Sequence, residues 1–159
     1  MSVELLINGK AFNVDAGIGD TLLSVLREKL DFKSAKRGCN QGVCGACTVS
    51  VDGWPMRGCL SLAVGCAGKD IRTLEGLSAT RRMQFLQEAF VNFGAFQCGF
   101  CTPGMLVAAD ALLARELNPS HEDVKVAMSG NLCRCTGYLP IVAAVRNAAE
   151  RIRKEAARG

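Results

Sequence analysis

The chain has 159 residues, of which 49% are hydrophobic and 21% are charged, and its mean hydropathy is slightly positive. This composition excludes a largely disordered chain and allows a sizeable buried core. The net charge of +4 comes from scattered basic residues and not from an aligned stripe, so we expect no nucleic-acid partner.

The first residues lack the basic start and the long apolar core of an export signal, and no apolar run reaches membrane-spanning length. We therefore expect a cytoplasmic protein that does not insert into a membrane. The sequence contains nine cysteines. Because the cytoplasm keeps thiols reduced, we expect these cysteines to bind metal or to carry out redox chemistry instead of forming a disulfide framework.

Strand and turn signals dominate the first part of the chain. Residues 3–7 and 11–14 are predicted to form a hairpin through Asn8-Gly9, because this dipeptide suits a tight turn of positive φ. A helix is predicted over residues 22–30, where apolar side chains recur at helical spacing.

A second hairpin is predicted from residues 48–51 to residues 54–56 through Asp52-Gly53, and a short strand near residues 71–73 follows it. Together with the first hairpin and its helix, these segments are expected to form a small mixed sheet with one helix packed on it.

After about Gly76 the strand signals nearly vanish and helical patterns replace them. Apolar residues share one helix face over residues 83–93 and another over residues 105–113, with Pro103 near the start of the second helix.

Two further helices are predicted towards the end of the chain. Ser120 with Asp123 indicates a weak capping box for a short helix that ends at about Met128. An apolar stripe over residues 141–152 predicts the last helix, and four amphipathic helices joined by short turns favour a compact bundle.

These patterns predict an α+β chain of two domains. We expect a strand-rich domain at residues 1–76, a linker at residues 77–81 and a helical domain at residues 82–159.

The first group of cysteines is compact and has the spacing Cys39-x4-Cys44-x2-Cys47, followed by Cys59. This spacing matches the plant-type ferredoxin pattern for a 2Fe-2S cluster. The intervening glycines allow the backbone angles of a tight loop, whose N–H groups can point at a negatively charged cluster. A zinc site is the alternative, but zinc usually draws paired knuckles.

The second group consists of Cys98-x2-Cys101 and Cys133-x-Cys135. Its spacing fits a zinc tetrahedron about as well as an iron–sulfur cluster, so the residues alone leave both open. Both pairs lie at turns between predicted helices, where helix ends offer free N–H groups to a negative centre.

Three strings carry a resemblance to a known family: GCNQGVCGACTV at residues 38–49, QCGFCTPG at residues 97–104 and GNLCRCTGY at residues 130–138. Together they closely resemble the small iron–sulfur subunit of molybdenum hydroxylases. This is the xanthine oxidase family, which includes carbon monoxide, aldehyde, quinoline and nicotinate dehydrogenases. The resemblance covers nearly the whole chain and implies that the second quartet, like the first, holds a 2Fe-2S cluster.

The resemblance implies an amino-terminal β-grasp ferredoxin-like domain and a carboxy-terminal four-helix-bundle domain, each with one cluster. It also implies an electron-transfer subunit of an oxidoreductase that has no substrate-converting site of its own. Its partners would be a large subunit with a molybdenum-pterin cofactor and a medium subunit with FAD, often arranged as a dimer of heterotrimers. The eight implied iron ligands are Cys39, Cys44, Cys47 and Cys59 for the first cluster and Cys98, Cys101, Cys133 and Cys135 for the second.

The resemblance further implies an order for the electrons, which would pass one at a time from molybdenum to the second quartet, then to the first, and then to FAD or another acceptor. Gln97 and the backbone at Cys135 are implied contacts of the pterin. The alternative is a free-standing ferredoxin, but such a carrier needs only the first quartet and leaves residues 82–159 unexplained.

Five other residues have simpler interpretations. Cys66 lies among small apolar neighbours and is expected to be a buried structural thiol, and the single histidine, His121, is expected to face solvent. Trp54 either packs on the sheet or faces a partner. Arg57 and Arg134 lie close to predicted ligands and are candidates for stabilising the reduced clusters, with ordinary surface arginines as the alternative.

Overall fold

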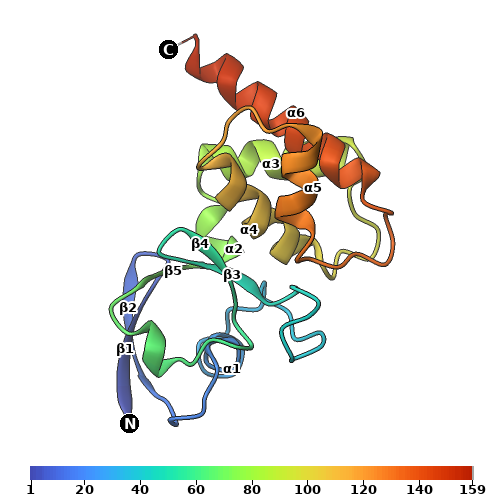
Figure 1. Ribbon diagram of the computed structural model, residues 1–159. Helices are drawn as coiled ribbons and strands as arrows, with labels where there is room; N and C mark the ends of the chain where they lie inside the picture. The colour runs from blue at the N-terminus through green and yellow to red at the C-terminus, as the bar shows by residue number, and fades with distance from the viewer. Residues whose placement is uncertain (159) are drawn as a thin grey trace.

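The computed structural model describes residues 1–158 and contains a five-stranded mixed sheet and a separate group of helices (Figure 1). The strand order is β2-β1-β5-β3-β4. The strands are β1 (Ser2–Ile7), β2 (Lys10–Asp15), β3 (Thr48–Val51), β4 (Trp54–Arg57) and β5 (Asp70–Arg72). The predicted α+β fold class is confirmed.

Both predicted hairpins are present, and each turns where the sequence places a residue pair that tolerates positive φ. Strands β1 and β2 are antiparallel around Asn8 and Gly9, whose φ angles are 52° and 79°. Strands β3 and β4 are antiparallel around Asp52 and Gly53, at 50° and 80°. Strand β5 lies between β1 and β3, parallel to the first and antiparallel to the second, which makes the sheet mixed.

The helix predicted over residues 22–30 is confirmed in place but widens along its length. It begins as α1 (Leu22–Ser24) and continues as the π-helical stretch η1 (Val25–Lys29). Thr21 caps its start, because the Thr21 Oγ1 atom accepts a hydrogen bond from the Ser24 amide at 3.1 Å. The buried leucines of α1 and η1 fill the core beneath the sheet.

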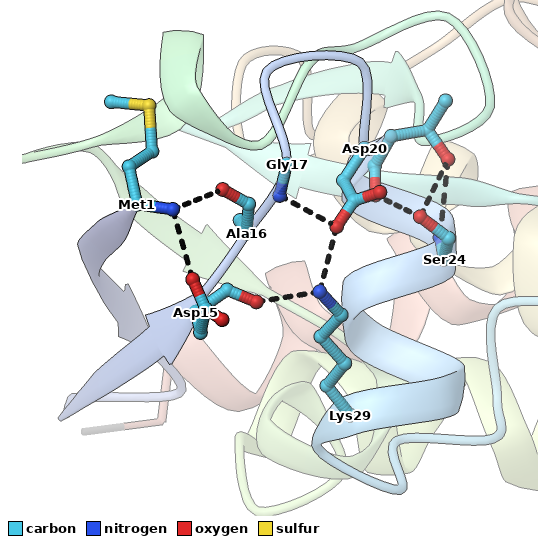
Figure 2. Close-up of polar contacts among 8 residues, drawn as sticks. Met1, Asp15, Ala16, Gly17, Asp20, Ser24 and Lys29 are labelled. Atoms are coloured by element: carbon cyan, nitrogen blue, oxygen red, sulfur yellow. Dashed lines mark hydrogen bonds and ion pairs between the residues drawn. The ribbon is translucent and has the colours of Figure 1, made fainter.

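Polar contacts tie this helix to the first hairpin (Figure 2). The amino group of Met1 donates to Asp15 Oδ1 at 2.9 Å and to the Ala16 carbonyl at 3.0 Å. The Lys29 ammonium donates to the Asp15 carbonyl at 2.5 Å and to Asp20 Oδ2 at 2.7 Å. The end of η1 is therefore held against the end of β2.

The rest of the chain is helical, apart from the short 3-10 turn η2 (Val64–Cys66) that precedes β5. The helices are α2 (Leu74–Leu77), α3 (Arg81–Asn92), α4 (Thr102–Leu113), α5 (His121–Met128) and α6 (Leu139–Ala156). The four predicted amphipathic helices are α3 to α6, and α2 is one additional turn that the sequence patterns did not indicate. The predicted capping box of α5 is present, with Ser120 Oγ accepting from the Asp123 amide at 3.1 Å.

Two separate buried cores support the two parts of the molecule. One lies between the sheet and α1, and the other lies inside the helical group. Helix α4 packs against α3 and α5 and also against β3 and β4, so it is the helix with the most extensive contact to the sheet. In Figure 1 the sheet occupies the lower half and α3, α5 and α6 lie above it.

Among residues 1–158, no helix combines the length and the apolar character that crossing a membrane requires.

Candidate metal centres

Three cysteines of the first quartet lie in the long loop that leads into β3, and the fourth, Cys59, follows β4. Backbone amides in this loop point at the sulfur atoms. The Cys39 amide lies 3.4 Å from Cys44 Sγ, the Cys44 amide lies 3.3 Å from Cys39 Sγ, and the Gln41 amide lies 3.5 Å from Cys39 Sγ. Such N–H groups stabilise negative charge on sulfur, which is what a thiolate-bound metal group requires.

The loop can turn its amides inward because of its glycines. Gly42 has a φ of 81° and Gly45 a φ of 74°, in the left-handed region that a side chain disfavours. The predicted role of the glycine-rich loop is therefore visible in its backbone.

Cys47 and Cys59 form the inner side of the first quartet. Cys47 is buried at the start of β3, and Cys59 is buried in the turn that follows β4, within hydrogen-bonding reach of Cys47. Burial raises the pKa of Cys47 to about 11. By contrast, hydrogen bonds from the backbone of Cys44 and Gln41 lower the pKa of Cys39 to about 6. Metal binding would displace the proton that the Cys47 thiol otherwise holds.

The second quartet is assembled from two turns that are far apart in the chain. Cys98 and Cys101 precede α4, whereas Cys133 and Cys135 lie between α5 and α6. The sulfur atoms of Cys98 and Cys135 are 3.6 Å apart, and Cys101 is within hydrogen-bonding reach of Cys133. A cavity of about 160 Å³ opens at this point, and all four cysteines line it.

Hydrogen-bond donors also surround the second quartet. Thr136 approaches Cys133 Sγ with its amide at 3.4 Å and its hydroxyl at 3.2 Å. Burial alone would raise the pKa of Cys133, but these contacts and the Cys135 amide bring that pKa below its usual value. Burial raises the pKa of Cys101 to about 12. The Tyr138 hydroxyl accepts from the Cys133 amide at 2.9 Å and so holds the backbone of this turn.

The two quartets lie on loops that touch. The amide of Leu132, next to Cys133, donates a hydrogen bond of 2.8 Å to the carbonyl of Cys44. One ligand candidate of each quartet is therefore joined to the other through a single hydrogen bond and a short stretch of backbone.

The remaining predicted residues have clear positions. Gln97 and Arg134 are exposed and line the cavity of the second quartet. Cys66 is buried in the core of the sheet domain, and His121 is exposed at the start of α5, as predicted. Trp54 is 62% exposed and lies beneath the Arg115 guanidinium, at 3.9 Å from its ring centre.

Arg57 does not approach a cysteine sulfur through a hydrogen bond. Its guanidinium contacts the Thr48 hydroxyl at 3.0 Å and the carbonyl of Gly130. Sequence reasoning missed Thr48 and Asn131, which hold the two loops together, and Tyr138, which holds the second loop. All three lie inside the cysteine-containing strings at residues 38–49 and 130–138, and their polar side chains there were the signal that could have indicated this role.

Large apolar side chains are exposed around both quartets. Phe100 and Leu132 line the cavity of the second quartet and are 47% and 49% exposed. Beside the first quartet, Val43 and Leu60 are 59% and 64% exposed. Exposed apolar groups beside a functional loop are typical of a surface that a partner covers.

The donor set suits an iron–sulfur group. All nine cysteines are free thiols, and the only histidine belongs to neither quartet. Thiolates are soft ligands that favour zinc or iron–sulfur clusters. Over residues 1–158, no three His, Cys, Asp or Glu side chains are arranged to hold a single metal ion directly.

Two family descriptions match the chain. Residues 5–69 match the 2Fe-2S iron-sulfur cluster binding domain, and residues 73–146 match the 2Fe-2S binding domain. Each match contains one of the two quartets.

Known proteins resemble the chain over nearly its full length. It is 46% identical to the nicotinate dehydrogenase small FeS subunit of Eubacterium barkeri, over 95% of this chain and 96% of that protein. It is also 46% identical to the xanthine dehydrogenase iron-sulfur-binding subunit of Escherichia coli O157:H7, over 89% and 90%.

A solved structure shows the same fold. A chain of the quinoline 2-oxidoreductase of Pseudomonas putida 86 superimposes with a TM-score of 0.90 and 46% identity, over 97% of this chain and 96% of that one. Identity of this level across both quartets and both parts of the fold shows common descent. The chain therefore belongs to the family of small iron–sulfur subunits of the molybdenum hydroxylases, which are oxidoreductases.

Proposed function

We propose that this chain conducts electrons between the redox centres of two partner subunits, through two 2Fe-2S clusters that its cysteines bind. The proposed ligands of the first cluster are Cys39, Cys44, Cys47 and Cys59, and those of the second are Cys98, Cys101, Cys133 and Cys135. A 2Fe-2S cluster takes up and releases one electron at a time, so two of them can serve a reaction that releases two electrons together.

The observation that carries this proposal is the hydrogen bond of 2.8 Å between the Leu132 amide and the Cys44 carbonyl. It links the two cysteine loops directly across the junction of the sheet and the helices. The bond fixes how far apart the two loops lie. Two quartets that exchange electrons benefit from it, because a fixed geometry keeps donor and acceptor close.

The arrangement of the ligands supports the binding of clusters. Each quartet combines thiols with N–H or hydroxyl donors aimed at sulfur, which offset the negative charge of a thiolate-bound cluster. The two buried cores support a division into a ferredoxin-like domain and a helical domain, for which we propose residues 1–76 and 82–159 with a linker at 77–81; Leu77 of this linker is buried in the helical core, and Gly159 lies outside the described residues.

We assign the partners from the family and from the exposed apolar groups. Both relatives are subunits, and the nicotinate dehydrogenase relative is a small one, which supports larger partners for this chain. A large subunit with a molybdenum-pterin cofactor is proposed to cover the second quartet, where Gln97 and the backbone of Cys135 would contact the pterin. A medium subunit with FAD is proposed at the first quartet. The proposed assembly is a dimer of heterotrimers, and the free thiols favour the cytoplasm.

The proposal is tested by purifying the chain together with the subunits that accompany it. We expect about four irons per chain and two distinct signals in electron paramagnetic resonance after reduction, as two 2Fe-2S clusters require. Molybdenum is expected in a partner. Cys39→Ser should remove one signal and Cys98→Ser the other, whereas the control Cys66→Ser should keep both.

Iron near two per chain together with zinc would overturn the second cluster. A chain that purifies alone, with full iron and no partner, would instead favour the free-standing ferredoxin. The relatives argue against that alternative, because their similarity extends over the helical part as well as the first quartet.

A further inference from the structure

Arg57 spans the junction between the two parts of the molecule. Its Nη1 atom donates to Thr48 Oγ1 at 3.0 Å, and its Nη2 atom donates to the carbonyl of Gly130. Thr48 begins β3 beside Cys47, and Gly130 precedes the turn that carries Cys133. One guanidinium therefore binds the loop of each quartet.

Asn131 makes the reciprocal contact from the helical part. Its side chain is buried, with the residue only 2% exposed, and its Nδ2 atom donates to the Gly45 carbonyl at 3.0 Å and to Thr48 Oγ1 at 3.1 Å. The Thr48 hydroxyl in turn donates to the Gly45 carbonyl at 2.6 Å. This junction cluster, which consists of Arg57, Thr48 and Asn131, is tied to the carbonyls of Gly45 and Gly130, and the Nε atom of Arg57 is buried without a hydrogen-bond partner.

The junction cluster brackets the hydrogen bond between the loops. Gly45 follows Cys44, and Asn131 precedes Leu132, so the contact from Asn131 to Gly45 lies directly beside the contact from Leu132 to Cys44. The two backbones are in close contact here, because a Cβ atom on Gly45 would lie only 2.5 Å from the Gly130 carbonyl oxygen. The two loops can separate only if the junction cluster opens.

Two roles for Arg57 are physically distinct. Its positive charge can raise the reduction potential of a nearby cluster, which needs only a cation. Its planar fork can instead fix the spacing of the loops, which needs two contacts at once. Its terminal nitrogens contact Thr48 at the start of β3 and Gly130 across the junction. Neither contact is to a sulfur atom, which favours the second role.

We infer that Arg57 and Asn131 are positioning residues that hold the two cluster-binding loops at the spacing required for electron transfer between them. The inference rests on the proposed function. The step concerned moves one electron, so that one iron becomes ferric as another becomes ferrous, and no bond or proton changes place.

The test compares the wild-type holoprotein, purified with its accompanying subunits, with Arg57→Lys and Asn131→Ala. Lysine keeps the charge but replaces the planar fork, whose two nitrogens reach Thr48 and Gly130 separately, with one compact ammonium that cannot reproduce that geometry. Arg115→Lys is the matched control, because Arg115 also crosses the junction, donating to the Gly53 carbonyl at 2.6 Å, but touches neither cysteine loop. If Arg57→Lys loses iron, Thr48→Ala replaces it in the comparison, because this variant removes the hydroxyl that accepts from both Arg57 and Asn131.

Two readouts are independent of turnover. Hydrogen exchange at the Leu132 amide should accelerate by about tenfold or more in Arg57→Lys and Asn131→Ala, the effect of losing a hydrogen bond to a charged or buried partner. The magnetic interaction between the two reduced clusters should weaken in these variants. Arg115→Lys should leave both readouts at the wild-type values.

Unchanged hydrogen exchange at Leu132 together with an unchanged magnetic interaction in Arg57→Lys would overturn the inference. Arg57→Gln removes the charge, and a shift of the reduction potential in this variant with no change in the other two readouts would assign the charge role instead. An equal effect in Arg115→Lys would also overturn it, because any weakening of the junction would then suffice. If the wild-type protein lacks one cluster, the proposed function fails, whereas the exchange of Leu132 still tests the contacts of Arg57.

Discussion

Replacing Gly104 by alanine should destabilise the protein, although alanine is the better helix former. Gly104 is buried in the first turn of α4, and its backbone does not need positive φ. A Cβ atom here would lie 2.5 Å from the Gly45 carbonyl oxygen and 3.1 Å from Asn131 Nδ2. The first distance is shorter than a Cβ atom tolerates, so α4 or the first cysteine loop must move.

Two opposing effects set the magnitude. Helix propensity favours alanine over glycine by about 1 kcal/mol in a helix interior. Overpacking costs about 1–3 kcal/mol, and the upper end applies here because the atom in the way is backbone held by the junction cluster. The difference is a net loss of about 2 kcal/mol, which lowers the melting temperature of a chain of this size by about 4–8 °C.

Thermal unfolding of the purified holoprotein measures this shift. The matched control is Gly65→Ala in η2, because a Cβ atom at Gly65 meets nothing within 4 Å and the position has no positive φ. The control should leave the melting temperature unchanged or raise it. Alanine lowers the conformational entropy of the unfolded chain, which stabilises the folded state by about 0.4–1 kcal/mol. A Gly104→Ala protein that melts at or above the control would refute the reasoning.

Three further substitutions test other contacts. Asp110→Ala removes the carboxylate that Arg82 binds at 2.7 and 2.9 Å. Since Arg82 is partly exposed and can turn to water, urea unfolding should show a loss of about 2 kcal/mol, and an unchanged midpoint would contradict this. Tyr138→Phe removes the hydroxyl that accepts from the Cys133 amide, so the second cluster should be lost faster to a chelator, and equal retention would speak against that role. Cys66→Ala should keep full iron and lose about 1 kcal/mol of stability, whereas missing iron would identify Cys66 as a ligand.

Local patterns predicted most of the elements correctly because their causes are local. The pairs Asn8-Gly9 and Asp52-Gly53 turn the two hairpins, since their backbone angles are tolerated whatever surrounds them. The capping box of α5 likewise involves residues three apart. The π-helical stretch η1 was not predicted, because the apolar spacing of residues 22–30 indicates only a helix and not its hydrogen-bonding pattern.

The candidate site divides in the same way. Three cysteines of the first quartet share one loop, so their spacing alone indicated a cluster. Arg57 was considered for its charge near Cys59, but its direction was not predictable, because its partner Gly130 belongs to the other half of the chain. Asn131 passed unnoticed for the same reason.

By itself, the sequence determined the strands, the helices and the compact first quartet, and its motifs identified the family, because each of these depends on residues that are close along the chain. Only the tertiary structure decided that the turn before α4 and the turn after α5 line one cavity, and that the Leu132 amide binds the Cys44 carbonyl. The physical reason is the packing of α4 on β3, a contact between distant segments that no local spacing encodes.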